Sequence, residues 1–197
     1  KTNKYFNSLI LVNNDLEILQ KYNKKKLVPF GEFLPMENLL NKFGFKKITE
    51  GHGSFSAGTN DNIIKIENII SIPLICYEII FPELIQKSTK DSNLIINISE
   101  DGWFGNSIGP HQHFSKAIFR SIENNTFLVR SANQGISAII DNKGEILKKL
   151  ETHETGSIEM NIPLIKSDYK NKNDLIFLIL LITYLAIFLI FKKNAKK

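Results

Sequence analysis

Cys76 is the only thiol in the 197 residues, and its position in the sequence suits a nucleophile. It follows the apolar run Ile69–Ile75, which predicts a buried strand, and precedes Glu78–Ile85, which has helical spacing. A side chain on such a turn is exposed at the end of a sheet, where backbone N–H groups can bind an oxyanion. A lone cysteine is more often an inert core residue, so position alone leaves both interpretations open.

A thiol needs a base or a positive neighbour to become a nucleophile, and one stretch offers both charges. Tyr22–Pro35 reads YNKKKLVPFGEFLP, with Lys24, Lys25 and Lys26 ahead of a turn that holds Glu32 between two phenylalanines. Solvated lysines are the plain interpretation of the run, whereas a carboxylate in apolar surroundings needs a partner if it is buried. The stretch therefore predicts a cation and a carboxylate near the thiol.

Other residues that could carry chemistry give weaker signals. His111 and His113 could bind a metal, but residues two apart on a helix point in different directions and no acidic third ligand follows. We therefore expect no metal and no cofactor, and interpret His113 as part of a site wall or a helix-start contact. Trp103 follows a buried strand, where it could shape a substrate site or simply pack. The glycines of Gly51–Gly58 lack the Lys-Ser/Thr of a phosphate loop.

Composition excludes several classes of function. The chain has 25 Lys+Arg against 20 Asp+Glu, a net charge of +5, but four lysines lie in the last six residues. The rest of the chain carries about +1, which argues against a surface that tracks nucleic-acid phosphates. One cysteine excludes an intrachain disulfide framework.

The segment 175–191 predicts a transmembrane helix. It contains 17 residues without a charge, a glycine or a proline. A helix of this length spans about 26 Å, close to the ~30 Å hydrocarbon core, and flanking lysines can snorkel to the interface. A buried core helix is the alternative, but the run lacks a polar stripe. The positive-inside rule places the tail 192–197 in the cytoplasm and the body on the other side of the membrane.

The order of the predicted elements indicates an α/β chain, layered as an α+β sandwich with several antiparallel pairs. Helical spacing occurs in Pro35–Phe43 and Pro110–Asn125, where a proline suits the first turn. Apolar runs bounded by turn residues predict the strands. These are Ser8–Val12, Leu16–Gln20, Ile63–Ile66, Ile69–Ile75, Leu94–Ile98, Phe127–Ser131, Ile136–Ile140, Glu145–Leu150 and Ser157–Ile162.

Three motifs occur in one order: KKKLVPFGEFLP, ICYEIIFPE and ISEDGWFGNSIGPHQHF. Together they resemble the apolipoprotein N-acyltransferase family, a membrane branch of the nitrilase, or carbon-nitrogen hydrolase, superfamily. The resemblance extends from about Tyr5 to Asp141 and to a final transmembrane helix. It implies a nitrilase-like αββα sandwich over residues 1–165, incomplete at its N-terminus, then a linker at 166–174, a membrane helix at 175–191 and a basic cytoplasmic tail at 192–197.

The resemblance also implies a set of site residues. Cys76 matches the nucleophile, and Lys24, eight residues before Glu32, matches the catalytic lysine. Glu32 matches a further carboxylate near the triad, and Tyr77 and Glu78 match residues that support activity. The chemistry agrees, since the Lys24 ammonium would stabilise the thiolate and an oxyanion, with the N–H of Tyr77 as a second donor. A helix that begins near Glu78 would favour the thiolate through its dipole.

The implied reaction moves an acyl chain from a phospholipid to Cys76 as a thioester, then to the N-terminal diacylglyceryl-cysteine of an apolipoprotein. It implies a bacterial inner membrane, with the catalytic part periplasmic. The family's general-base Glu and helix bundle lie upstream of the residues present, and Asp15 and Glu17 do not replace that base. We therefore expect this chain alone to be inactive. A membrane-anchored nitrilase-type amidase and a non-catalytic fragment that binds a partner remain the alternatives.

Overall fold

Six strands form the main sheet in the order β3-β4-β5-β6-β7-β8 of a computed structural model. The model describes residues 4–36, 39, 42, 44, 54–59, 62–86, 91–168 and 173–194. β4, β5 and β6 are parallel, and the remaining neighbours pair antiparallel, which confirms the predicted mixture. The strands are β3 (Ile64–Ile66), β4 (Ile69–Ile75), β5 (Leu94–Glu100), β6 (Leu128–Asn133), β7 (Ser137–Ile140) and β8 (Ile146–Leu150).

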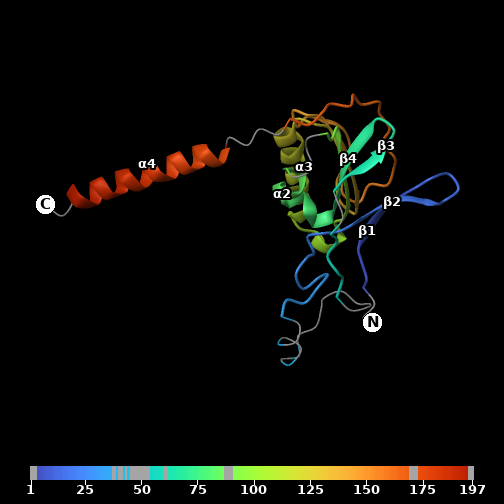
Figure 1. Cartoon of the computed structure of the whole chain (residues 1–197), viewed down its shortest axis with the longest axis horizontal. Coiled ribbons are helices and arrows are strands. Elements are labelled where there is room, and N and C mark those ends of the chain that lie inside the picture. The colour runs from blue at the N-terminus through green and yellow to red at the C-terminus, as the bar shows by residue number, and fades with distance from the viewer. Residues whose placement is uncertain are drawn as a thin grey trace.

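The central strands are apolar throughout because both faces of the sheet are covered. Successive side chains of β4 point to opposite faces, so Leu74 packs into the larger core and Ile75 into a second, smaller one. Phe114 and Ala117 of α3 (Gly109–Asn124) meet Leu74 in the larger core. Figure 1 shows α3 and the short α2 (Pro82–Gln86) together on that side of the sheet.

The helix α3 confirms the helix predicted at Pro110–Asn125. Pro110 lies in the first turn, where a missing N–H costs nothing, and Asn125 ends the helix with a left-handed backbone at φ 48°.

The opposite face of the sheet carries a hairpin of β1 (Ser8–Val12) and β2 (Ile18–Asn23). Tyr22 of this hairpin is buried together with Ile75 in the smaller core, and Leu9 and Leu11 pack against that core. The prediction placed the return strand at Leu16–Gln20, which begins too early. The side chain of Asn13 accepts hydrogen bonds from the N–H groups of Asp15 and Glu17, so this turn extends through Leu16, whose φ is 62°.

Two predicted elements are wrong, and one falls mostly outside the described residues. Ser157–Ile162 forms no strand, and its described contact with the sheet edge is a hydrogen bond from the Lys148 side chain to the carbonyl of Glu159. The helix expected at Glu78–Ile85 is instead a 3-10 helix, η2 (Cys76–Ile80), followed by α2. Phe81 between them is extended because Pro82 disfavours helical geometry before it. Most of Pro35–Phe43 lies outside the described residues.

The irregular segment 151–168 is fastened to the amino ends of β5 and β6. The N–H of Ser167 donates to the carbonyl of Ser92, two residues before β5, at 2.7 Å. The Thr126 hydroxyl, before β6, donates to the carbonyl of Ile165 at 3.0 Å, and the Ser167 hydroxyl donates to the carbonyl of Asn124 at 2.9 Å. The chain therefore leaves the body at the end of the parallel strands opposite to Cys76.

The last helix, α4 (Asn173–Asn194), contains the predicted membrane segment (Figure 1). Its window Leu175–Lys192 has a mean hydropathy of 2.8, and none of it is buried. By length and composition this helix can cross a bilayer.

Candidate active site

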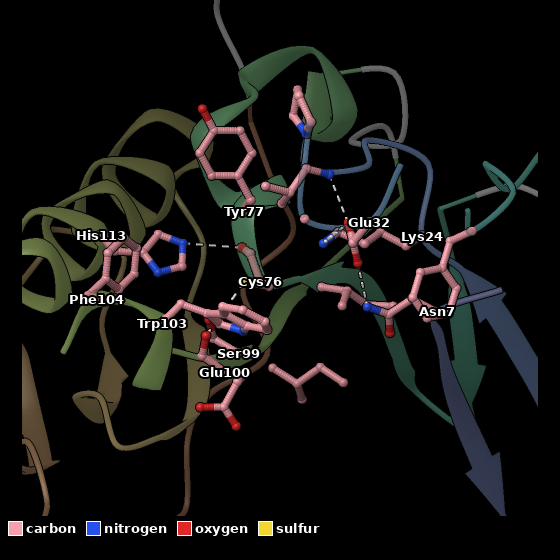
Figure 2. Close-up of a pocket in the computed structure, with 16 residues that line it drawn as sticks. Asn7, Lys24, Glu32, Cys76, Tyr77, Ser99, Glu100, Trp103, Phe104 and His113 are labelled. Carbon is pink, nitrogen blue, oxygen red and sulfur yellow. Dashed lines mark hydrogen bonds and ion pairs between the residues drawn. The ribbon is translucent and has the colours of Figure 1, made fainter. Parts of the chain in front are cut away.

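A cavity of about 570 Å³ opens where the parallel strands β4 and β5 end. The carboxyl ends of neighbouring parallel strands meet at one edge of a sheet, where loops can collect reactive side chains. Four of the five predicted site residues line this cavity, namely Lys24, Glu32, Cys76 and Tyr77 (Figure 2). The other lining residues are Asn7, Val28, Pro29, Gly31, Phe55, Ile75, Ile98, Ser99, Glu100, Trp103, Phe104 and His113.

Cys76 sits on a strained turn directly after β4. Its φ is 52°, a left-handed backbone that residues other than glycine rarely adopt. Such conformations cost about 1–3 kcal/mol and persist only where the surroundings hold them. The thiol is partly exposed to the cavity, and its Sγ lies 3.9 Å from the carbonyl oxygen of Glu100. The turn thus presents the sulfur at the cavity wall, as expected for a nucleophile.

Lys24 and Glu32 form a buried ion pair in the wall of the cavity. Lys24 Nζ lies 2.7 Å from Glu32 Oε2, with only 1% of the lysine side chain exposed. Lys25 and Lys26 instead line a neighbouring cavity, and Lys26 makes a half-exposed pair with Glu83. Of the three successive lysines, Lys24 is therefore the one that faces the thiol's cavity.

Both oxygens of the Glu32 carboxylate accept hydrogen bonds. Asn7 Nδ2 donates to Oε1 at 2.7 Å, and the N–H of Val28 donates to Oε2 at 2.8 Å. The turn that carries Glu32 closes through Phe30, whose φ is 62° and whose N–H donates to the carbonyl of Phe33. These contacts fix the Glu32 carboxylate beside the Lys24 ammonium.

Glu78 does not line the cavity but lies behind the turn, fully buried. Its Oε1 accepts hydrogen bonds from the Tyr22 hydroxyl at 2.8 Å and from the N–H groups of Lys25 and Lys26 at 2.7 and 3.1 Å. Its Oε2 accepts from the N–H of Ile75 at 2.8 Å. Burial, followed by the charge of Glu78, raises the pKa of Tyr22 above its ordinary value of 10.0. The carboxylate thereby joins the loop of residues 24–26, the lysine loop, to the turn at Cys76, the nucleophile turn.

The prediction that a helix begins near Glu78 and favours the thiolate through its dipole is wrong. Cys76 is itself the first residue of the 3-10 helix η2, and no α-helix begins at Glu78. Tyr77 lines the cavity and packs edge-on against Phe81, with ring centroids 5.5 Å apart. Trp103, in η3 (Gly102–Phe104), is 62% exposed at the cavity and does not pack into the core.

A buried ionic network under the turn was missed by sequence reasoning. His113 Nε2 lies 3.2 Å from the carbonyl oxygen of Cys76 (Figure 2). His113 Nδ1 lies 2.9 Å from Asp101 Oδ1. Arg130 Nη2 donates to Asp101 Oδ2 at 2.6 Å, and Arg130 also donates to Asn97. One feature of the sequence could have indicated this network, since the chain has only two arginines beside 23 lysines. Arginine is the basic residue best suited to a buried ion pair with a carboxylate.

The charges of this network set the pKa of Asp101. Burial alone would raise that pKa, but the hydrogen bond with His113, the charge of Arg130 and the hydroxyl of Ser99 outweigh it. The pKa therefore lies below its ordinary value of 3.8. Burial lowers the pKa of Arg130, and Asp101 opposes that shift. His111, by contrast, is exposed on α3, and within the described ranges no three His, Cys, Asp or Glu side chains converge as a metal site.

The carbon-nitrogen hydrolase family model matches residues 1–168, the whole body of the chain up to α4. The chain belongs to the carbon-nitrogen hydrolase family. The predicted superfamily and nitrilase-like fold are thereby confirmed, and Cys76, Lys24 and Glu32 all lie within the matched residues.

Relatives with longer chains are about 40% identical to most of this chain. The apolipoprotein N-acyltransferase of Rhizobium leguminosarum bv. trifolii is 41% identical over 160 residues, which cover 81% of this chain and 30% of that protein. The enzyme of the same name from Rhodopseudomonas palustris is 42% identical over 159 residues, with 80% and 30% covered. The chain spans about a third of the length of these curated relatives.

Solved carbon-nitrogen hydrolase structures show the same fold at low identity. Saccharomyces cerevisiae Nit3, of the nitrilase superfamily, superposes with a TM-score of 0.56 at 19% identity, covering 76% of this chain and 51% of that one. An amidase from Nesterenkonia sp. gives 0.53 at 18% identity, with 74% and 51% covered.

Proposed function

We propose that this carbon-nitrogen hydrolase chain is the thiol-bearing part of an apolipoprotein N-acyltransferase. The observation that carries the proposal is the meeting, in one cavity, of a strained Cys76 and a buried Lys24–Glu32 pair. The relatives at about 40% identity bear that enzyme's name, and α4 adds an apolar helix that suits lipid substrates. The exposed Trp103 at the cavity offers a further apolar contact for an acyl chain.

The first half-reaction acylates the thiol. Cys76 Sγ forms a bond to the ester carbonyl carbon of a phospholipid, the C–O bond to the glycerol breaks, and a lysophospholipid alcohol leaves with the proton from the thiol. Lys24 stabilises the negative charge on sulfur and on the carbonyl oxygen, and the N–H of Tyr77 is the second donor to that oxygen. Glu32 fixes the Lys24 ammonium through the 2.7 Å contact.

The second half-reaction passes the acyl chain to an amine. The α-amine of an apolipoprotein's N-terminal diacylglyceryl-cysteine attacks the thioester, an amide bond forms, and the Cys76 thiolate leaves. Each half needs a base to carry one proton. Glu32 already accepts from Asn7, Val28 and Lys24, so we assign the base to a carboxylate upstream of residue 1. Without such a base we expect no turnover by this chain alone.

The proposal places the reaction at a bacterial inner membrane, with the body periplasmic and the lysine tail cytoplasmic. Both lipid substrates are confined to the bilayer surface, so a site joined to α4 meets them at high local concentration. The alternative of a membrane-anchored amidase shares the fold and the thiol, and it differs only in the group that accepts or loses the acyl chain.

The test uses a phospholipid with a labelled acyl chain, presented in detergent micelles to this chain and to a longer protein that includes upstream residues. We expect labelled thioester on Cys76 in the longer protein, none in its Cys76→Ala variant, and transfer to a synthetic peptide that begins with diacylglyceryl-cysteine. Release of free labelled acid without any transfer to the peptide would favour the hydrolase alternative. Label on Cys76→Ala would overturn the assignment of the nucleophile.

A further inference from the structure

The strained turn of Cys76 is held from below by a chain of buried polar groups drawn from three elements. His113 comes from α3, Asp101 from the loop after β5, and Arg130 from β6. The side chains of Asp101 and Arg130 are fully buried, and that of His113 is 3% exposed. None of these groups is offered to substrate except the edge of the His113 ring, which lines the cavity.

The hydrogen-bond partners require a proton on one particular nitrogen of His113. The Cys76 carbonyl oxygen only accepts hydrogen bonds, so Nε2, which lies 3.2 Å from it, donates from a protonated nitrogen. On the other side of the ring, Nδ1 lies 2.9 Å from Asp101 Oδ1 and 3.2 Å from Arg130 Nη2. These two contacts hold the ring in the orientation that points Nε2 at the Cys76 carbonyl.

We propose that His113 is a positioning residue of the nucleophile turn, which fixes the left-handed backbone of Cys76 by donating from Nε2 to the Cys76 carbonyl. The inference rests on the proposed function only in taking Cys76 as the nucleophile. Asp101 orients the ring through Nδ1, and Arg130 and the Ser99 hydroxyl orient Asp101. The carbonyl so held belongs to the peptide group whose N–H is that of Tyr77, the proposed oxyanion donor, so His113 aims that donor as well.

Two substitutions separate the two ends of the ring. In His113→Gln the amide nitrogen reaches about as far as Nε2, so a donor to the Cys76 carbonyl is kept. In His113→Asn the amide reaches only as far as Nδ1, so Asp101 keeps a partner and the Cys76 carbonyl loses its own. His111→Asn, exposed on the same helix, is the matched control.

Two small reagents report on Cys76 in the full chain in detergent, without any phospholipid. Iodoacetamide alkylates the thiol with no oxyanion, whereas p-nitrophenyl acetate acylates it through one: the S–C bond forms, p-nitrophenolate leaves, and the thiol proton goes to solvent. Mass spectrometry of the peptide that contains Cys76 gives both rates at the thiol, separately from any acetylation of the 23 lysines. We expect the ratio of acylation to alkylation to fall about tenfold or more in His113→Asn, and to stay within about threefold in His113→Gln and His111→Asn.

An unchanged ratio in His113→Asn would overturn the proposal. So would an equal fall in both His113 variants, because it would show that the charge or the packing of the ring matters and the bond to Cys76 does not. If His113→Asn does not fold, as judged by its melting transition, a tenfold fall in folded His113→Gln still overturns it. Because neither reagent is a lipid, these outcomes are independent of whether a phospholipid is the natural donor.

Discussion

The hydroxyl of Tyr22 donates to the carboxylate of Glu78 at 2.8 Å, and both side chains are fully buried although 56 residues separate them. This contact, with the N–H groups of Lys25, Lys26 and Ile75 on the same carboxylate, fastens the lysine loop to the nucleophile turn. A carboxylate outside the cavity thus joins the segment that carries Lys24 to the turn that carries Cys76.

The first prediction follows from that fastening. Glu78→Gln turns an amide group toward N–H donors, so at least one donor loses its acceptor, and we expect a destabilisation of about 1–3 kcal/mol. Tyr22→Phe removes one donor and leaves three, so its cost should be nearer about 1 kcal/mol. Urea unfolding of the full chain in detergent measures both. A Glu78→Gln variant as stable as the parent would show that the carboxylate is not needed to join the two segments.

The second prediction separates the lysines by burial. Lys24→Ala removes the ammonium that faces Cys76, and we expect the rate of acyl-enzyme formation in the longer protein to fall about 10²–10³-fold. Lys25→Ala and Lys26→Ala remove charges outside this cavity and should change that rate very little. Equal losses at all three positions would indicate a general effect of charge. Melting transitions of the variants distinguish lost chemistry from the cost of leaving Glu32 unpaired.

A third prediction concerns acid. Because the pKa of Asp101 in the fold lies below its ordinary 3.8, the network stabilises the fold above that value and loses this contribution as the pH falls through the folded pKa. The free energy of unfolding should therefore decline progressively below about pH 5. In Asp101→Asn, which is less stable at neutral pH, this part of the decline should be absent. Parallel curves for both proteins between pH 6 and the acid limit would contradict the expectation.

Gly135 offers a way to disturb the network without touching its members. A Cβ at this position would lie 2.3 Å from Asp101 Oδ2 and 2.6 Å from Asp101 Cβ. Asp101 cannot move away, since Arg130 and His113 hold it, so Gly135→Ala should cost about 1–3 kcal/mol. At Gly156 the nearest atom is a terminal methyl of Leu150 at 3.3 Å, which makes Gly156→Ala the matched control. Equal melting temperatures for the two variants would refute the tight fit.

The last prediction concerns topology. Four lysines follow the apolar segment within the last six residues, against Lys166, Lys170 and Lys172 on the other flank. The positive-inside rule counts these charges, so the tail should be cytoplasmic and the body extracytoplasmic. A fluorescent protein that matures only in the cytoplasm, fused after Lys197 of the longer protein, should be bright. A dark fusion together with an active periplasmic reporter at the same site would invert the orientation.

The elements that sequence could predict are those whose signal is local. The apolar run of β4 and the spacing of Phe114 and Ala117 in α3 identify a buried strand and a one-sided helix, because each pattern reflects what covers that segment. Ser157–Ile162 has a strand-like pattern too, but a strand also needs a partner edge. The contact between Lys148 and Glu159 there is made by a side chain and forms no ladder.

The site divides in the same way. Cys76, Lys24 and Glu32 could be found from the short motifs that contain them. The direction of the Glu78 side chain could not, because it is decided by backbone N–H groups more than 50 residues away. Asp101 and Arg130 lie 29 residues apart and meet only because β5 and β6 are parallel neighbours. Pairing of strands, which single-sequence patterns do not specify, creates this part of the site.

The hydrogen bonds that hold segment 151–168 against the body determine the length of free chain between the body and α4. The chain from Asp168 to Asn173 is five residues long and spans at most about 18 Å when fully extended. If segment 151–168 were not held, the free chain would begin at Leu150, where β8 ends, and could span about 80 Å. Effective concentration falls steeply once a tether exceeds the span it must bridge. The hydroxyls of Thr126 and Ser167, at the end of the sheet opposite to Cys76, therefore limit how far the body can move from the bilayer in which α4 is proposed to lie.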